Sequence, residues 1–121
     1  MSRARKHYDL LAWQEAIALV TKVYSLTQCF PDTERYALVQ QMRRAAVSVP
    51  SNIAEGVARN SKQEFSRFLA IARGSLSELD TQLIIARNLG YVSEISEIES
   101  CIDPLFSKIS ALINSLKAKE V

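Results

Sequence analysis

Several residue types are scarce in this chain of 121 residues, and each scarcity excludes a class of function. The only histidine is His7, and the two cysteines, Cys29 and Cys101, show no CxxC or Cys/His spacing, so we expect no zinc site. The three glycines stand apart, which excludes a glycine-rich phosphate loop. No apolar run approaches the ~18 to 20 residues that cross a bilayer. We therefore expect no metal, no cofactor and no membrane segment.

The N-terminal region has some features of a secretion signal. Basic residues precede the apolar stretch LLAWQEAIALV, but Gln14 and Glu15 interrupt that stretch and no small-residue cleavage site follows it. Two cysteines without a pairing pattern are typical of a reducing cytosol. We expect a single cytoplasmic domain over residues 1–121, with residues 1–8 and the last few residues (KAKEV) flexible.

The spacing of apolar residues predicts four helices and no strands. The expected helices run from Leu11 to Cys29, from Thr33 to Ala58, from a cap at Ser61 to Leu89, and from a cap at Ser93 to Lys117. Ser61 and Glu64 form a capping box, Phe30-Pro31-Asp32 ends the first helix, and Gly90 ends the third. Because the connections are short, the fold class is an all-α, antiparallel, up-down-up-down four-helix bundle.

Each helix carries a stripe of residues that we expect in the core. The stripes are Trp13, Ala16, Ile17, Val20, Val23, Tyr24 and Thr27; Leu38, Met42, Ala45, Ala46, Val49, Ile53 and Val57; Phe65, Leu69, Ala72, Leu76, Leu79, Leu83 and Ala86; and Ile95, Ile98, Ile102, Leu105, Ile109, Leu112 and Leu116. The second stripe keeps its phase across Pro50, which favours a continuous helix kinked at that proline. A break into two helices is the alternative.

Two further faces carry unusual residues. On the second helix Gln41, Arg44, Ser48, Asn52, Glu55 and Arg59 share a sector of ~80°. On the third helix a second line comprises Glu64, Arg67, Ile71, Gly74, Ser75, Glu78, Gln82, Ile85 and Leu89.

A helix with two packed faces needs a partner beyond its own bundle. We expect a homo-oligomer with a polar network of Arg44, Ser48, Asn52, Glu55, Arg67, Ser75 and Glu78, including the pairs Arg44–Glu78 and Arg67–Glu55. The alternative is that these residues make contacts within a monomer.

Positive charge is concentrated in the first part of the chain. Residues 1–73 hold 11 Lys/Arg and 6 Asp/Glu, and the remaining residues hold 4 and 7, although the net charge is only +2. The candidate phosphate-binding residues are Arg3, Arg5, Lys6, Arg43, Arg44, Arg59 and Lys62. The alternative is solvated surface charge, since no helix-turn-helix or RNP signature accompanies them.

The sequence gives no support to catalysis. His7 has no partner nucleophile in a readable arrangement, and Glu55, Glu64 and Glu78 lack the ExxH spacing of di-iron bundles. We expect these carboxylates to be structural and the protein not to be an enzyme.

Two motifs support a family resemblance: RRAAVSVPSNIAEG (Arg43 to Gly56) and EFSRFLAIARGSLSELDTQL (Glu64 to Leu83). They resemble the four-helix-bundle family named for proteins encoded in 23S rRNA intervening sequences, to which the accessory protein of diversity-generating retroelements belongs. The resemblance implies a homopentameric ring and, in the retroelement relative, nucleic-acid binding and contact with a reverse transcriptase. The family-motif positions are Arg43, Arg44, Ser48, Pro50, Asn52, Glu55, Gly56, Arg67, Ser75 and Glu78, whose role in the family is more structural than catalytic.

These observations lead to two functional hypotheses. The first is a non-enzymatic oligomeric accessory protein that binds structured RNA or DNA through its phosphates. The alternative is a protein–protein interaction scaffold that binds no nucleic acid. Phosphate binding weakens steeply with ionic strength, whereas a mainly apolar contact need not, so salt dependence separates the two hypotheses.

Overall fold

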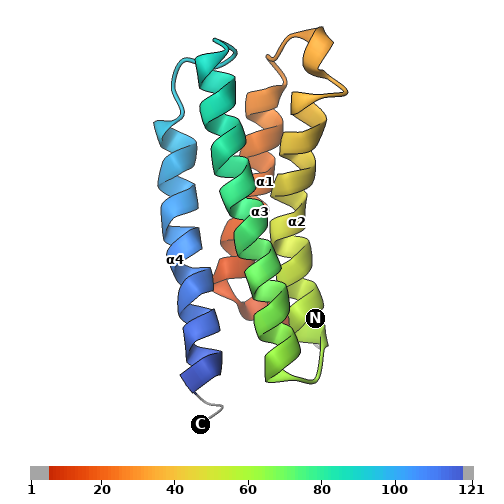
Figure 1. Cartoon of the computed structure of the whole chain (residues 1–121), viewed down its shortest axis with the longest axis vertical. Coiled ribbons are helices and arrows are strands. Elements are labelled where there is room, and N and C mark those ends of the chain that lie inside the picture. Colours follow the sequence, from red (N-terminus) through yellow and green to blue (C-terminus); the bar gives the residue numbers. More distant parts are fainter. Residues whose placement is uncertain (1–5, 119–121) are drawn as a thin grey trace.

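A computed structural model describes residues 6–118, and this part of the chain contains four α-helices and no strand. The elements are η1 (Lys6–Asp9), α1 (Leu11–Thr27), η2 (Asp32–Glu34), α2 (Leu38–Ala58), α3 (Lys62–Asn88) and α4 (Ser96–Ala118), where η denotes a short 3-10 helix. In Figure 1 the chain passes upwards along α1, downwards along α2, upwards along α3 and downwards along α4. The predicted all-α four-helix bundle is confirmed.

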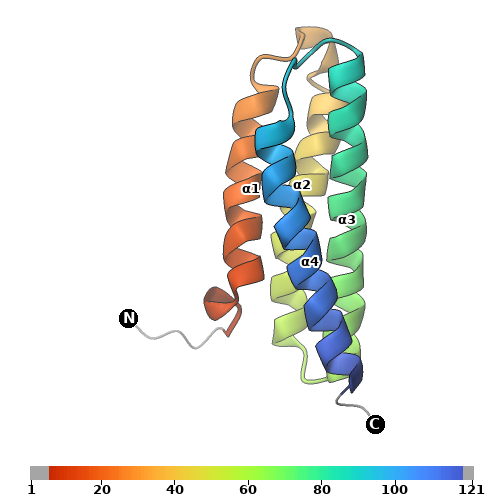
Figure 2. The same cartoon turned by 90° about the vertical axis from the view of Figure 1, so that its left-hand side faces the viewer.

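The core lies between the four helices. Each α-helix packs against the next one in the sequence, and α4 returns to pack against α1, as Figure 2 shows. The largest fully buried side chains are Leu19, Met42, Ile53, Leu69, Leu76, Leu79, Leu83, Ile95, Leu105 and Ile109. Removing these apolar surfaces from water is the main force that holds the helices together. Within residues 6–118 no helix is both long and apolar enough to cross a membrane.

The second helix begins later than the sequence predicts, at Leu38 and not at Thr33. Residues 32–34 form η2, and Ala37 has φ −123° and ψ −103°, which is outside the helical region. The Glu34 carboxylate accepts a hydrogen bond from the Leu38 amide at 3.3 Å and so satisfies a donor in the first turn of α2. The first helix ends at Thr27 and not at Cys29.

The second helix continues without a break through Pro50, as expected. The alternative of two separate helices is wrong, because residues on both sides of the proline bury the same face of α2. The kink at Pro50 stays a prediction.

Serine, glycine and glutamate residues set the ends of α3 and α4. The Ser61 hydroxyl accepts a hydrogen bond from the Glu64 amide at 3.1 Å, which confirms the N-cap of α3. Gly90 has φ +81°, the left-handed conformation predicted for the residue that ends this helix. The predicted cap at Ser93 is wrong: α4 begins at Ser96, whose amide donates to the Glu94 carboxylate at 2.8 Å. This hydrogen bond lowers the pKa of Glu94.

The predicted core stripe is accurate on α3 and wrong in part on α1. On α3 all predicted members are buried except Phe65, which is half-buried. On α1 the side chains of Ile17 and Tyr24 are 42% and 41% exposed, while Ala12 and Leu19 are buried instead. Apolar residues cover more than one side of α1, so periodicity alone does not determine which side faces the core.

The other two stripes differ only near the ends of their helices. Leu38, Val57, Leu112 and Leu116 are half-buried, whereas Val39 and Ile113, which the prediction omitted, are buried.

The structure describes the segment before α1 from residue 6 onwards. Lys6–Asp9 form η1, and the rings of His7 and Tyr8 lie 5.0 Å and 5.3 Å from the Trp13 ring, centroid to centroid. These residues were expected to be flexible. The remainder of the expected flexible arm, residues 1–5, and residues 119–121 lie outside the described part of the chain.

Candidate functional site

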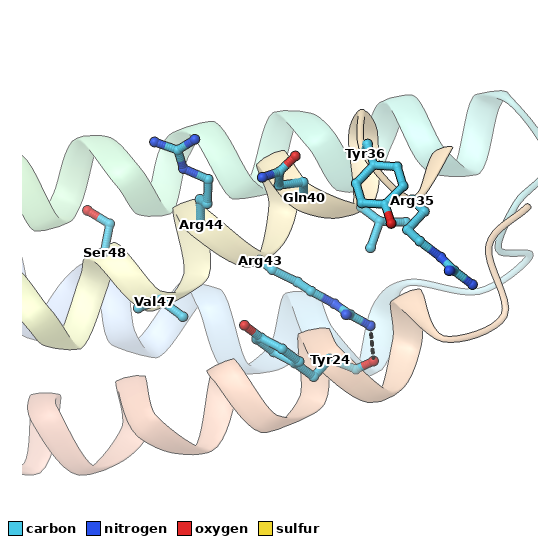
Figure 3. Close-up of a pocket in the computed structure, with 9 residues that line it drawn as sticks. Tyr24, Arg35, Tyr36, Gln40, Arg43, Arg44, Val47 and Ser48 are labelled. Carbon is cyan, nitrogen blue, oxygen red and sulfur yellow. Dashed lines mark hydrogen bonds between the residues drawn. The ribbon is translucent and has the colours of Figure 1, made fainter. Parts of the chain in front are cut away.

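An open groove lies on the outer face of the first half of α2, and we call it the Tyr24–Tyr36 groove (Figure 3). Its volume is about 600 Å³, and no carboxylate lines it. The lining residues are Tyr24 of α1, Arg35 and Tyr36 of the α1–α2 connection, and Val39, Gln40, Arg43, Arg44, Val47 and Ser48 of α2. An adjoining hollow of about 340 Å³ shares Arg35, Val39 and Arg43 with it.

Arg43 is held firmly across the gap between α2 and α1. Its Nε donates to the Thr27 hydroxyl at 2.9 Å, and a terminal nitrogen donates to the Tyr24 carbonyl oxygen at 3.3 Å (Figure 3). The guanidinium carbon lies 4.4 Å from the centroid of the Tyr24 ring, a distance typical of a cation–π contact. Within residues 6–118 no carboxylate forms an ion pair with Arg43. The groove therefore contains a fixed positive charge without a counter-charge.

The two other arginines of the groove are less constrained. Figure 3 shows Arg44 pointing to the opposite side of α2 from Arg43, and the described chain gives Arg44 no ion pair or hydrogen bond. Arg35 lies 3.5 Å from the Asp32 carboxylate, but both side chains are more than half exposed, at 63% and 94%. Exposed pairs of this kind contribute little to stability, so Arg35 is available to another anion.

Tyr36 presents an exposed ring on an ordered backbone. Its side chain is 82% exposed. The turn that carries it is closed by backbone hydrogen bonds from Arg35 to Asp32 at 3.1 Å and from Ala37 to Glu34 at 3.0 Å. Tyr36 therefore adds an aromatic surface to a groove lined by arginines.

A hydrogen bond between two connections fixes this turn to the rest of the bundle. The Tyr91 hydroxyl, in the α3–α4 connection, donates to the Glu34 carboxylate at 2.7 Å. This hydrogen bond raises the pKa of Tyr91, because the neutral phenol can donate to the carboxylate and the phenolate cannot. The Tyr91 ring also packs on Phe30, with 5.5 Å between ring centroids.

The predicted phosphate-binding residues do not lie on one surface. Arg43 and Arg44 line the groove, whereas Arg59 and Lys62 lie at the α2–α3 turn, at the opposite end of the bundle in Figure 1. The rise of an α-helix places Arg44 and Arg59 about 22 Å apart along α2. Lys6 belongs to η1, and Arg3 and Arg5 lie outside the described residues.

The arginine at the α2–α3 turn is already paired. Arg59 lies 3.2 Å from the Glu55 carboxylate, and its guanidinium carbon lies 5.1 Å from the Phe68 ring centroid. Both contacts stabilise the end of α2, so Arg59 is a weaker candidate for phosphate binding than Arg44.

The predicted polar network forms in part within one chain, between α2 and α3. The Ser48 and Ser75 hydroxyls are hydrogen-bonded at 2.8 Å. The Asn52 amide nitrogen donates to both the carbonyl and the hydroxyl oxygen of Ser48, each at 2.8 Å. These three residues therefore make the intramolecular contacts that we considered as the alternative.

The ion pairs Arg44–Glu78 and Arg67–Glu55 do not form within the described chain. Arg67 pairs with Glu64 on its own helix at 3.0 Å, which lowers the pKa of Glu64. Glu55 pairs with Arg59, and Glu78 accepts a hydrogen bond from the Gln82 side chain at 3.3 Å. The two predicted pairs stay predictions for an interface between copies of the chain.

The second line of α3 lies on the outside of the bundle. Ile71, Ile85 and Leu89 are 41%, 43% and 54% exposed. Gln82 is only 5% exposed, and its side-chain oxygen is buried without a hydrogen-bond partner in the described chain. A buried amide oxygen without a partner is unfavourable, and this oxygen is already enclosed by its own chain.

The remaining chemically active side chains are dispersed. Within the described residues no three His, Cys, Asp or Glu side chains lie close enough together to hold a metal ion. Cys29 and Cys101 are both free thiols.

Sequence reasoning missed six residues that line the groove: Tyr24, Arg35, Tyr36, Val39, Gln40 and Val47. Tyr24 was assigned to the core, and Arg35 and Tyr36 were placed inside a helix that begins only at Leu38. A signal was present in the sequence, because the apolar periodicity of the second helix begins at Leu38, after the polar segment that follows Pro31.

Together, the fold and the groove define a small helical-bundle protein with a basic, aromatic-lined surface. A family model described as 23S rRNA-intervening sequence protein matches residues 8–115, and the chain belongs to this family. The resemblance inferred from the Arg43–Gly56 and Glu64–Leu83 motifs is confirmed. A search of curated proteins found no match.

Proposed function

We propose that the protein is a non-enzymatic accessory protein that binds structured RNA or DNA through backbone phosphates. The observation that carries the proposal is the Tyr24–Tyr36 groove, which is lined by Arg35, Arg43 and Arg44 and by no carboxylate. Arginines are well suited to phosphate, because a planar guanidinium can donate two parallel hydrogen bonds to it. Arg43 is already immobilised, so little side-chain entropy is lost when it binds an anion.

We further propose that the protein acts in the cytoplasm as a homo-oligomer, as a pentamer if the family resemblance extends to assembly. The exposed Ile71, Ile85 and Leu89 support an interface on the outer side of α3. Each additional copy would add one groove, and several weak phosphate sites on one particle bind a long nucleic acid far more tightly than one site does. By resemblance to the retroelement relative, a reverse transcriptase or another protein is a further partner in this proposal.

A protein–protein interaction scaffold without nucleic-acid binding is the second candidate. The same exposed apolar residues on α3 favour it, since clustered apolar side chains on a surface often mark a protein contact. The affinity of such a contact would change little with salt. The affinity for phosphates would fall as salt rises, because releasing condensed counterions into a more concentrated salt solution gains less free energy.

The first proposal is tested by fluorescence anisotropy with a labelled RNA hairpin and a labelled DNA duplex at several salt concentrations. We expect affinity to fall with salt, and Arg44→Glu to reduce the slope of log K against log salt by about 1. Lys117→Glu is the matched control, because it changes the net charge equally on an exposed residue at the other end of the bundle. Binding that is unaffected by salt, or lowered equally by both variants, would contradict the proposal.

The second proposal is tested by light scattering across micromolar concentrations. We expect a mass of several chains, reduced by Ile85→Glu but not by Phe106→Glu, which alters an exposed apolar residue on α4. The mass of one chain at every concentration would remove the oligomer from consideration and leave the phosphate-binding proposal to the anisotropy experiment.

A further inference from the structure

We infer that the Tyr24–Tyr36 groove binds single-stranded nucleic acid, with an unpaired base stacked on Tyr36 and phosphates of the strand bound by Arg43 on one side of α2 and by Arg44 on the other. The inference rests on the proposed function and names the form of nucleic acid that the groove takes. It depends on three features: an open aromatic ring, a hollow of suitable size, and uncompensated positive charge beside the ring.

The ring of Tyr36 is available for stacking. It is 82% exposed, and the chain has no more exposed large apolar or aromatic side chain among the described residues. Its backbone is fixed by the hydrogen bonds of the η2 turn. The hydrogen bond from Tyr91 to Glu34 at 2.7 Å fixes that turn to the rest of the bundle. A base that stacks on such a ring does not have to order a loop, so more of the stacking energy appears as affinity.

The second tyrosine of the groove has a different role. One face of the Tyr24 ring is covered by the Arg43 guanidinium at 4.4 Å. Tyr24 therefore orients Arg43 rather than a base, and Figure 3 shows the guanidinium beside Tyr24, with its hydrogen bond to the Tyr24 carbonyl oxygen. A guanidinium held in this way can meet a phosphate or stack on a second base.

The size of the groove suits one or two nucleotides better than it suits the surface of a folded macromolecule. A volume of about 600 Å³ lies within the range of small-ligand sites, which is about 300–1,000 Å³. The side chains of Val39 and Val47 contribute apolar surface beneath a base, while the arginines supply charge for the phosphates.

An aromatic platform favours single strands over duplexes. In a duplex each base is already stacked on its neighbours and offers no face to a protein ring, whereas an unpaired base does. Stacking on aromatic side chains is tolerant of sequence, because every base has a π-face. We therefore expect binding with little sequence preference and with a strong preference for unpaired strands.

The test compares a fluorescein-labelled oligouridylate of about 12 nucleotides with a labelled RNA duplex of the same length, by anisotropy, in low and moderate salt. Four variants are measured: Tyr36→Ala, Tyr36→Phe, Arg44→Gln and Phe106→Ala. The last is the matched control, since Phe106 is also an exposed aromatic residue near an arginine, with the Arg73 guanidinium carbon 6.0 Å from its ring centroid.

We expect the oligouridylate to bind more tightly than the duplex. Tyr36→Ala should weaken that binding about 5- to 100-fold, while Tyr36→Phe, which keeps the ring, and Phe106→Ala should change it less than about 2-fold. Because the side chain of Tyr36 is exposed, the alanine variant should keep the thermal midpoint of the wild type, which is verified in parallel.

Each contrary result has a separate meaning. If duplex and single strand bind equally, and Arg44→Gln weakens both while Tyr36→Ala weakens neither, stacking is overturned and phosphate binding stands. If neither nucleic acid binds even in low salt, both proposals are overturned and the groove is a surface for a protein partner.

Discussion

Gly56 shows how one missing methyl group permits a close helix contact. A Cβ atom at this position would lie 2.9 Å from the Cβ of Phe68 and 3.0 Å from a ring carbon of Phe65. Since the Phe68 Cβ is attached directly to the backbone of α3, it cannot move aside without moving the helix. Gly56 therefore allows α2 and α3 to approach near their turn. This is a physical reason for a glycine inside a helix, where it is otherwise unfavourable.

We expect Gly56→Ala and Gly74→Ala to change stability in opposite directions. Gly56→Ala should destabilise the protein by about 1–3 kcal/mol through overpacking. Gly74 has no atom within 4 Å of its Cβ position, so Gly74→Ala should stabilise α3 by about 0.5–1 kcal/mol. Urea denaturation of both variants measures the difference. Destabilisation by both substitutions would show that the outer side of α3 is also closely packed, as in an oligomer.

The hydrogen bond from Tyr91 to Glu34 predicts a dependence of stability on alkaline pH. The folded pKa of Tyr91 is raised above its ordinary value of about 10, so the contribution to stability is complete below that value. It is lost as pH rises through the folded pKa, because the unfolded phenol ionises more readily. Tyr91→Phe should therefore be less stable than the wild type at neutral pH, and the difference should diminish above about pH 10. Urea midpoints from neutral to alkaline pH measure this, and a difference that is constant with pH would contradict it.

At the scale of the helices, the two serines that were predicted as caps make a direct comparison possible. Ser61 accepts a hydrogen bond from the Glu64 amide, whereas α4 begins three residues after Ser93. We expect Ser61→Ala to cost about 1 kcal/mol and Ser93→Ala less than about 0.5 kcal/mol. Denaturation midpoints of the two variants test this, and equal losses would mean that Ser61 does not act as a cap.

The helices could be predicted from the sequence because their apolar spacing is regular, and the errors occur where it is not. The seam of α3 steps by four and three residues without interruption along the helix, and α3 buries these residues, apart from the half-buried Phe65. On α1 both Ile17 and Leu19 are apolar, and the choice between them depends on where α2 and α4 lie, which a local pattern does not contain. The start of α2 depends on a side-chain hydrogen bond from Glu34, which spacing does not reveal.

At the scale of the whole molecule, Leu79 tests the shared core. Its side chain is fully buried, with 0% exposure, in the cluster formed by all four helices. Leu79→Ala should destabilise the protein by about 2–5 kcal/mol, because it removes buried apolar surface and leaves a cavity. Leu11→Ala, at a residue that is 55% exposed, should cost less than about 1 kcal/mol. Thermal melting distinguishes the two, and an unchanged midpoint for Leu79→Ala would contradict the assigned core.

The candidate site was less predictable than the fold because it combines parts that are distant in the sequence. Arg43 and Arg44 were recognised from their type, but the residues that shape the groove around them come from α1 and from a turn. The amino-acid composition shows which residues are charged. The position of the Tyr36 ring, by contrast, depends on how the α1–α2 connection folds against the bundle. The same reason explains why Arg59 was grouped with Arg44 although the two lie about 22 Å apart along α2.

The order of helix contacts has a consequence for how the chain is made. Among the four described α-helices, α1 packs on α2, α2 on α3 and α3 on α4, and the contact of α4 with α1 is the one that joins α-helices far apart in the sequence. Folds dominated by such local contacts form within microseconds to milliseconds, far faster than a ribosome adds residues. We expect the first three helices to assemble on the ribosome while α4 is still being synthesised, so that the order of translation is also the order of packing.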